Sequence, residues 1–143
     1  MTPIEKEVVR RKLMIIIEDL KVLEHIKDMT IDQYVNDIYK RKATERLLQE
    51  LIEAAIDINT HIIVQSGNTV PGDYYESFIK TGELKIIPAG LAEKLAPSAG
   101  LRNRLVHEYD VLDHSVVLEA VKVVGDLYPE YIKAIEDYIS RQD

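Results

Sequence analysis

Three long segments of the sequence repeat apolar residues at alternating spacings of three and four, and this periodicity is the strongest constraint on the fold. Because an α-helix turns once in about 3.6 residues, such spacing gathers the apolar side chains into one stripe along a helix. The stripes predict three long helices that pack nearly parallel or antiparallel to their neighbours, and the tyrosines of the last stripe can place their hydroxyls at the edge of a core. The repeated residues are Val9, Leu13, Ile16, Leu20 and Leu23; Leu48, Leu51, Ala55, Ile58 and Ile62; and Val117, Val121, Val124, Tyr128, Tyr131, Ile135 and Tyr138.

Capping residues mark where the first two helices begin. Residues 2–5 read Thr-Pro-Ile-Glu, with a cap, a proline at the first helical position and a glutamate at the third, so a helix is predicted from here to near Asp28. Residues 30–33 repeat the pattern with Thr and Gln. The second helix is therefore expected to continue to about Gln65, with a break around residues 36–37.

Glycine and proline divide the stretch that follows. Residues 66–72 hold two Gly, one Asn and one Pro, and form the clearest loop of the sequence. Asp73 then caps a short helix that Gly82 is expected to end. Residues 83–87 are interpreted as a connector, because a strand there would have no partner elsewhere in the sequence. The next helix is expected to begin at Pro88.

Two breakers and a cap precede the last helix. Pro97 and Gly100 are expected to break or kink the chain before a helical segment at residues 101–107. Residues 110–113 are interpreted as a loop that ends in a cap, and the last helix is predicted for residues 114–140.

The segments predict an all-α fold. Long helices with one period and short connections favour an antiparallel bundle of about four to six helices. A chain of 143 residues suits one domain, so residues 1–143 are expected to form a single unit. At this length roughly two thirds of the unfolded surface can be buried, which makes a disulfide or structural metal unnecessary for stability.

Composition excludes several classes of function. The sequence has no Cys, which excludes disulfides, Cys-ligated zinc and thiol nucleophiles. The longest apolar run, residues 13–17, is far too short for a membrane span, and no signal-peptide pattern precedes it, so a cytoplasmic location is expected. The net charge of −7 argues against general coating of nucleic acid but allows a confined phosphate-handling site.

Motifs for metals and nucleotides are missing from the sequence. No Glu-x-x-His pair of the kind used by di-metal bundles occurs, and Asp57 with His61 supplies only two ligands, too few for a metal site. The six glycines are scattered singly, so no phosphate-binding loop or dinucleotide motif forms. We therefore expect neither a metal nor a cofactor.

Two polar segments remain as candidates. Residues 40–46 carry four cations against one anion and could contact phosphates, or could be a solvated helix face. Residues 101–109 gather two Arg, one Asn, one His and one Tyr. Arginine can clamp a phosphate and histidine can move a proton near neutral pH, so the second segment could support metal-free phosphodiester chemistry, although such clusters also cap helices.

The second segment resembles a known motif. Arg102, His107 and Tyr109 match the R-x-x-x-x-H-x-Y pattern of HEPN-domain proteins, and Asn103 after the arginine is also typical. The long first helix, the Glu-rich second helix, the Gly/Pro loop and the C-terminal helix are similar to the HepT toxin branch of the HEPN/MNT toxin–antitoxin systems. The resemblance covers nearly the whole chain.

The resemblance implies an all-helical homodimer that acts as a metal-independent endoribonuclease, with its site in a cleft at the dimer interface. His107 would be the general acid or base for attack of a ribose 2′-hydroxyl on the adjacent phosphate, Arg102 would stabilise the charge on phosphorus, and Asn103 would support the site. The implied antitoxin is a small nucleotidyltransferase that attaches AMP to Tyr109, adding negative charge that repels RNA.

Helix geometry complicates this assignment. Arg102 and Tyr109 would share one face of a straight helix, whereas His107 would lie roughly 140° away from Arg102. We therefore expect both that the helix ends near His107 and that a second protomer completes the site. Arg104, three residues before His107, is the closer neighbour on a helix and is kept as a second candidate for phosphate binding.

Two other functions stay open. A catalytically silent helical adaptor that positions the substrate of a nucleotidyltransferase is favoured by local charge, because residues 101–143 hold nine Asp or Glu against five Lys or Arg. An unrelated bundle with a polar helix end is the third reading, since a fold alone does not determine function.

Overall fold

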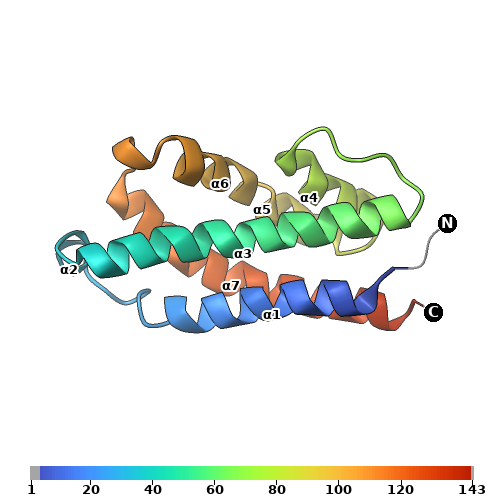
Figure 1. Cartoon of the computed structure of the whole chain (residues 1–143), viewed down its shortest axis with the longest axis horizontal. Coiled ribbons are helices and arrows are strands. Elements are labelled where there is room, and N and C mark those ends of the chain that lie inside the picture. Colours follow the sequence, from blue (N-terminus) through green and yellow to red (C-terminus); the bar gives the residue numbers. More distant parts are fainter. Residues whose placement is uncertain (1–3, 143) are drawn as a thin grey trace.

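The computed structural model describes residues 4–142 and has no β-strand within that range (Figure 1). Its helices are α1 (Lys6–Leu23), α2 (Ile31–Val35), α3 (Ile38–Gln65), α4 (Tyr74–Glu83), α5 (Ala89–Leu95), α6 (Ser98–His107) and α7 (His114–Ser140), with a 3-10 helix, η1 (Tyr109–Val111), between the last two. The predicted all-α fold is confirmed. None of the helices in this range is both long enough and apolar enough to cross a membrane.

The long helix α3 is the centre of the arrangement. It packs against α1 on one side and against α4 and α6 on the other, while α7 packs against α1, α2 and α5. Figure 1 shows that α3 and α7 run in one direction and that α1 and α6 run in the opposite direction. This layout places α6 and α4 side by side over α3, where they can share a surface.

The apolar stripes form the core. All five stripe residues of α3 are 1% exposed or less, which confirms that this helix is buried on its predicted face. Leu20 of α1 and Tyr138 of α7 are only partly buried and pack at the margin of the core, whereas the rest of both stripes is buried. Burial of these side chains is the main favourable contribution to folding.

The start of α1 differs from the prediction. The predicted cap Thr2 and the first-turn Pro3 lie outside the described residues. The helix begins at Lys6, so Glu5 precedes it instead of occupying its third position, and no side chain caps it. The Glu5 amide instead donates a 3.2 Å hydrogen bond to Nε2 of His61, so this histidine has a partner within the chain.

The end of α1 also differs. The helix α1 ends at Leu23 rather than near Asp28, and the amides of His25 and Ile26 donate to carbonyls three residues earlier. Such bonds tighten the chain into turns. The apolar stripe of this segment also ends at Leu23, so the predicted extension to Asp28 went beyond the residues that the stripe supports.

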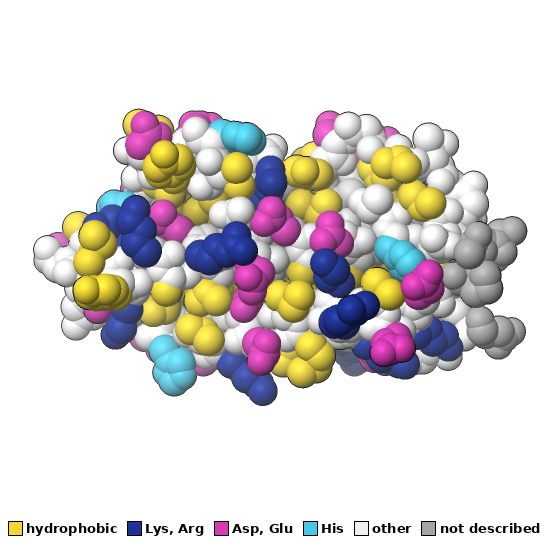
Figure 2. Space-filling view, in the orientation of Figure 1, with side chains coloured by type: hydrophobic (Ala, Val, Ile, Leu, Met, Phe, Trp, Pro, Cys, Tyr) yellow, Lys and Arg dark blue, Asp and Glu magenta, His cyan; other side chains and the backbone are white. Residues whose placement is uncertain are grey.

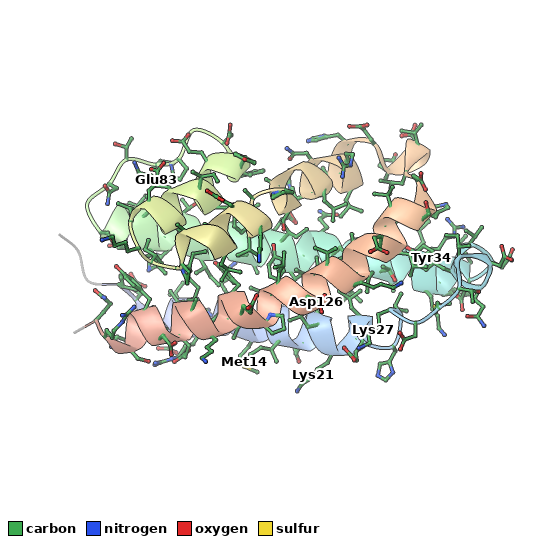
Figure 3. All side chains as sticks on the ribbon, turned by 180° about the vertical axis from the view of Figure 1, so that it is seen from behind. Met14, Lys21, Lys27, Tyr34, Glu83 and Asp126 are labelled. Carbon is green, nitrogen blue, oxygen red and sulfur yellow. The ribbon has the colours of Figure 1, made fainter. Side chains whose placement is uncertain are left out.

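The predicted break between α2 and α3 is confirmed. The Thr30 hydroxyl accepts a hydrogen bond from the Gln33 amide and the Gln33 side chain accepts one from the Thr30 amide, as in a capping box. Residues 36–37 interrupt the helix, and the Asp37 carboxylate caps α3 by accepting from the Lys40 amide. Tyr34 of α2 is buried where α2 packs on α7 (Figure 3).

The short helix α4 begins as predicted and ends differently. Asp73 caps it by accepting a 2.7 Å hydrogen bond from the Glu76 amide. Gly82 does not stop the helix, which continues to Glu83. A Cβ at Gly82 would lie 2.7 Å from the Cβ of Ala92, so glycine here allows α4 and α5 to approach closely. After the helix, the backbone of Lys85 adopts the left-handed conformation, with φ of 59°.

Proline sets the other boundaries. Residues 66–72 form a loop and residues 84–88 connect α4 to α5, in agreement with the sequence analysis. Pro88 lies just before the first helical residue rather than at it. Pro97 separates α5 from α6, whereas Gly100 lies within α6 and does not interrupt it. A single glycine costs a helix only about 1 kcal/mol, which the packing of α6 on α3 can offset.

Two tyrosines of α7 are more deeply buried than predicted. Tyr128 and Tyr131 are 0% exposed, so their hydroxyls lie inside the core and not at its edge. The Tyr131 hydroxyl donates to Oδ1 of Asn59 at 2.6 Å and lies 3.1 Å from the carbonyl oxygen of Ala55. Burial raises the pKa of Tyr131 well above its ordinary value, so the hydroxyl stays neutral.

A buried carboxyl group lies between α1 and α3. Asp19 is 6% exposed, although the apolar stripe of α1 predicted burial for its neighbour Leu20. Burial and the nearby Glu50 carboxyl raise the pKa of Asp19 to about 7, and the Arg46 guanidinium opposes them. The side chain is therefore partly protonated near neutral pH.

Candidate functional site

The candidate motif lies at the C-terminal end of α6. Leu101 and Leu105, one turn apart, are buried against the rest of the bundle, and Asn103 and Arg104 between them face solvent while Arg102 is partly buried. The last residue of α6 is His107. The motif therefore spans the final turns of a helix and the 3-10 helix η1 that follows.

The helix α6 ends at His107, before Tyr109 of the motif. Glu108 leaves the helical conformation, with φ of −128°, after its amide has made the last α-helical bond to the Arg104 carbonyl. The prediction that the helix ends near His107 is confirmed. Tyr109 lies in η1, outside α6, so it does not share the face with Arg102 that a straight helix would have given it.

Arg102 is the most constrained residue of the motif. Its guanidinium donates to Glu53 of α3 at 3.2 Å and lies over the ring of Tyr74 of α4, 4.9 Å from the ring centre. Only 16% of its side chain is exposed, against 34% for Glu53. The carboxylate and the ring fix the guanidinium between three helices.

The other residues around Arg102 complete a small polar network. Asn103 accepts a 3.3 Å hydrogen bond from Arg102, and the Gln49 side chain donates to Glu53 at 3.2 Å. Within residues 4–142, the hydrogen bonds and ion pairs of Arg102 go to Glu53 and Asn103, and none goes to His107. One chain thus brings Arg102 and Asn103 together but not Arg102 and His107.

The sequence analysis did not single out Glu53 or Tyr74. Glu53 follows the buried residues Leu51, of the second apolar stripe, and Ile52, and a carboxylate next to such a stripe is a signal for a paired charge. Tyr74 follows a helix cap and carries no such signal. The contact of each residue with Arg102 depends on how α3, α4 and α6 pack.

The remaining motif residues are exposed. Asn103, Arg104, His107 and Tyr109 all face solvent, and Tyr109 is 63% exposed. Figure 2 views this side of the bundle and shows Lys, Arg, Asp and Glu side chains interleaved along α3, with a Lys or Arg side chain next to hydrophobic ones where α6 and α4 meet. The exposed side chains can reach a ligand, whereas most of the Arg102 side chain is covered by its neighbours.

An apolar groove adjoins the motif between α6 and α7. It has a volume of about 300 Å³ and is lined by Leu101 and Arg104 of α6 and by Val116 and Val123 of α7. The two valines are 48% and 47% exposed. Covering branched apolar side chains that are this exposed lowers the free energy, so the groove is a favourable surface for a partner to bury.

The segment after η1 is anchored to α7 and α3. Asp113 caps α7 through hydrogen bonds from Ser115, which lower the pKa of the Asp113 carboxyl. His114 lies 3.3 Å from the guanidinium of Arg41. Arg41 belongs to the basic run of residues 40–46. Arg46 of the same run pairs with Glu50 at 3.6 Å, so two of the four cations of the run have partners within the chain.

Metal ligands do not gather in the part of the chain that the structure describes. No group of three or more His, Asp or Glu side chains there has an arrangement that could hold a metal ion. The site is therefore described by its arginines, its histidine and its aromatic residues.

A family model for HepT-like ribonucleases matches residues 16–137. The chain belongs to the HepT-like ribonuclease family. The match spans α3, α6 and η1, which carry Glu53, Arg102, His107 and Tyr109. The resemblance drawn from the R-x-x-x-x-H-x-Y motif is confirmed at the level of the family.

Relatives of this HepT-like chain include a nuclease. The tRNA nuclease HepT of Aphanizomenon flos-aquae is 39% identical over 141 residues, which cover 97% of this chain and 95% of the relative. A tri-AMPylated HEPN toxin of Shewanella oneidensis, solved in complex with MNT antitoxin, is 25% identical with a TM-score of 0.72 over 93% of this chain and 94% of that one.

The HepT-like fold also occurs in a protein of unknown function. The cytosolic protein YutE of Bacillus subtilis has a TM-score of 0.85 and 18% identity, over 98% of this chain and 94% of that chain. At this identity the likeness concerns the fold alone, and the motif residues have to carry the functional argument.

Proposed function

We propose that this HepT-like protein is the toxin of a HEPN/MNT toxin–antitoxin pair and acts as a metal-independent endoribonuclease. The observation that carries the proposal is the placement of His107 and Tyr109 on the exposed end of α6 and η1, in a chain of the HepT-like family. The tRNA nuclease relative supports RNA as the substrate class.

The chemistry follows from the residue types. His107 takes the proton of a ribose 2′-hydroxyl or returns one to the leaving 5′-oxygen, while the 2′-oxygen attacks phosphorus and the bond to the 5′-oxygen breaks. Arg102, oriented by Asn103, stabilises the negative charge on the phosphate oxygens, and Arg104 provides a second cation beside His107. A cyclic phosphate and a free 5′-hydroxyl are the products.

A homodimer would bring the separated residues together. In one chain Arg102 bonds to Glu53 and Asn103, so a nearby His107 from a second protomer is a direct way to complete the site. The apolar groove of α6 and α7 beside Arg104 supports such an interface, because its exposed valines would be covered.

The antitoxin would be a nucleotidyltransferase that modifies Tyr109. Tyr109 is 63% exposed on a short 3-10 helix, so a transferase can reach its hydroxyl. AMP attached here adds a negative phosphate and a bulky nucleoside beside His107 and Arg104. Both effects disfavour RNA binding, by repulsion and by occupying the cleft.

A second candidate function is a catalytically silent adaptor for the nucleotidyltransferase. The contact that favours it is the Arg102–Glu53 ion pair, which neutralises the arginine in the single chain. An adaptor would bind the transferase but would leave RNA intact at every salt concentration.

Induced expression tests the proposal. Wild type should arrest growth and degrade RNA, whereas Arg102→Ala and His107→Ala should do neither. Purified protein should cleave RNA in the presence of EDTA. The assignment as an active ribonuclease is wrong if wild type leaves growth and RNA unaffected or if both variants act like wild type. Cleavage that EDTA abolishes would contradict only the metal independence.

A further inference from the structure

The aromatic residue beside Arg102 is itself a candidate RNA contact. Tyr74 is the first residue of α4, whose start is fixed by the cap at Asp73. The Arg102 guanidinium covers one face of its ring at 4.9 Å, and 41% of the residue remains exposed. An exposed, oriented aromatic ring therefore lies directly next to the motif arginine.

Charge makes such a ring useful in this chain. The net charge is −7, and Glu53 already neutralises Arg102, so phosphate attraction alone gives RNA little affinity here. Stacking between a nucleobase and an aromatic ring needs no net charge and adds affinity for each base that stacks.

We propose that Tyr74 stacks on an unpaired base of the RNA strand, next to the phosphate that Arg102 contacts. This inference rests on the proposed ribonuclease function and names a substrate contact for it. The base must be unstacked from its neighbours to lie on the ring, so the ligand is single-stranded RNA or a loop. Every base has an aromatic face, so the contact tolerates any base.

Tyr75 provides a matched control. It is the next residue of α4 and is 53% exposed, and so offers a ring of the same chemistry, but the cation–ring contact of Arg102 is with Tyr74. If an exposed tyrosine anywhere on this helix sufficed, both positions would matter equally. The proposal assigns the contact to Tyr74 alone.

Binding of single-stranded RNA with methylated 2′-hydroxyls tests the inference, because methylation prevents cleavage and isolates affinity. Tyr74→Leu should weaken binding at least about fivefold, while Tyr74→Phe and Tyr75→Leu should bind like wild type. The second measurement uses a set of RNAs that each lack one base. At one position, removal of the base should weaken binding by wild type but should not weaken binding by Tyr74→Leu any further.

Two results with Tyr74→Leu would overturn the proposal. In the first, Tyr74→Leu binds RNA as tightly as wild type does. In the second, Tyr74→Leu binds every RNA of the set more weakly than wild type by the same factor, which would mean that the ring only holds Arg102 in place. The RNAs lacking a base also test wild type directly, and a wild type that loses affinity at no position overturns the proposal even if Tyr74→Leu does not fold. A wild type that neither binds nor cleaves RNA would refute the proposed function as well, whereas normal cleavage without a base-dependent loss refutes only the stacking contact.

Discussion

The guanidinium of Arg102 and the carboxylate of Glu53 lie 3.2 Å apart and join α6 to α3 at the point where the HepT-like motif begins. Because both side chains are largely shielded from solvent, the pair sets the charge that an approaching phosphate meets. A carboxylate in this place both orients the arginine and competes with RNA for it.

Glu53→Gln should therefore bind RNA more tightly. The amide keeps a hydrogen-bond acceptor for Arg102 and removes one negative charge, so affinity at low salt should rise on the order of fivefold. The gain should shrink as salt is added. Fluorescence anisotropy with uncleavable RNA measures the effect, and Glu93→Gln, an exposed change of equal charge on α5, should bind like wild type. Weaker binding by Glu53→Gln would mean that orientation outweighs competition.

Val123→Glu should disrupt the proposed dimer. Val123 is 47% exposed in the groove of α6 and α7, so a carboxylate there is solvated in the monomer but would be buried unpaired in an interface. The molar mass measured by light scattering should decrease from that of a dimer to that of a monomer, and RNA cleavage should decrease with it. Val70→Glu, at a 63% exposed loop position, serves as the control. A dimer that survives Val123→Glu places the interface elsewhere.

Tyr109 should be the residue that accepts AMP. Incubation with the cognate nucleotidyltransferase and ATP should increase the intact mass of wild type by the mass of an adenylyl group. Tyr109→Phe lacks the hydroxyl and should gain nothing, whereas Tyr39→Phe, at a tyrosine that is 87% exposed, should gain mass like wild type. An equal gain in Tyr109→Phe and wild type would rule out this site.

Asp19→Asn should stabilise the protein at alkaline pH. The folded pKa of Asp19 is raised to about 7, so wild type loses stability as pH rises from about 4 to about 7 and stays less stable above it. The variant cannot ionise, and its advantage at about pH 8 should be on the order of 3 kcal/mol and nearly absent at about pH 4. Urea denaturation at both pH values measures it, with Glu93→Gln, an exposed change on α5 that is remote from Asp19, as control. A pH-independent difference between Asp19→Asn and wild type would contradict the raised pKa.

The sequence by itself determined the helices and the family. Apolar spacing along one chain predicts which side of a helix is buried, because the helical period is a local property, and the stripe of α3 is buried as that spacing requires. Local capping chemistry likewise predicted the break before α3 and the start of α4. The motif from Arg102 to Tyr109, together with the order of the helices and the loop around it, indicated the HepT-like family.

Only the tertiary structure decided the surroundings of the motif. Glu53 and Tyr74 come from helices far from Arg102 in the sequence, and they meet it because α6 and α4 both pack on α3. The burial of Asp19 and of the Tyr131 hydroxyl likewise depends on which residues of the neighbouring helix α3 lie opposite them. Such contacts depend on the relative placement of several helices, and the period of a single helix carries no information about that placement.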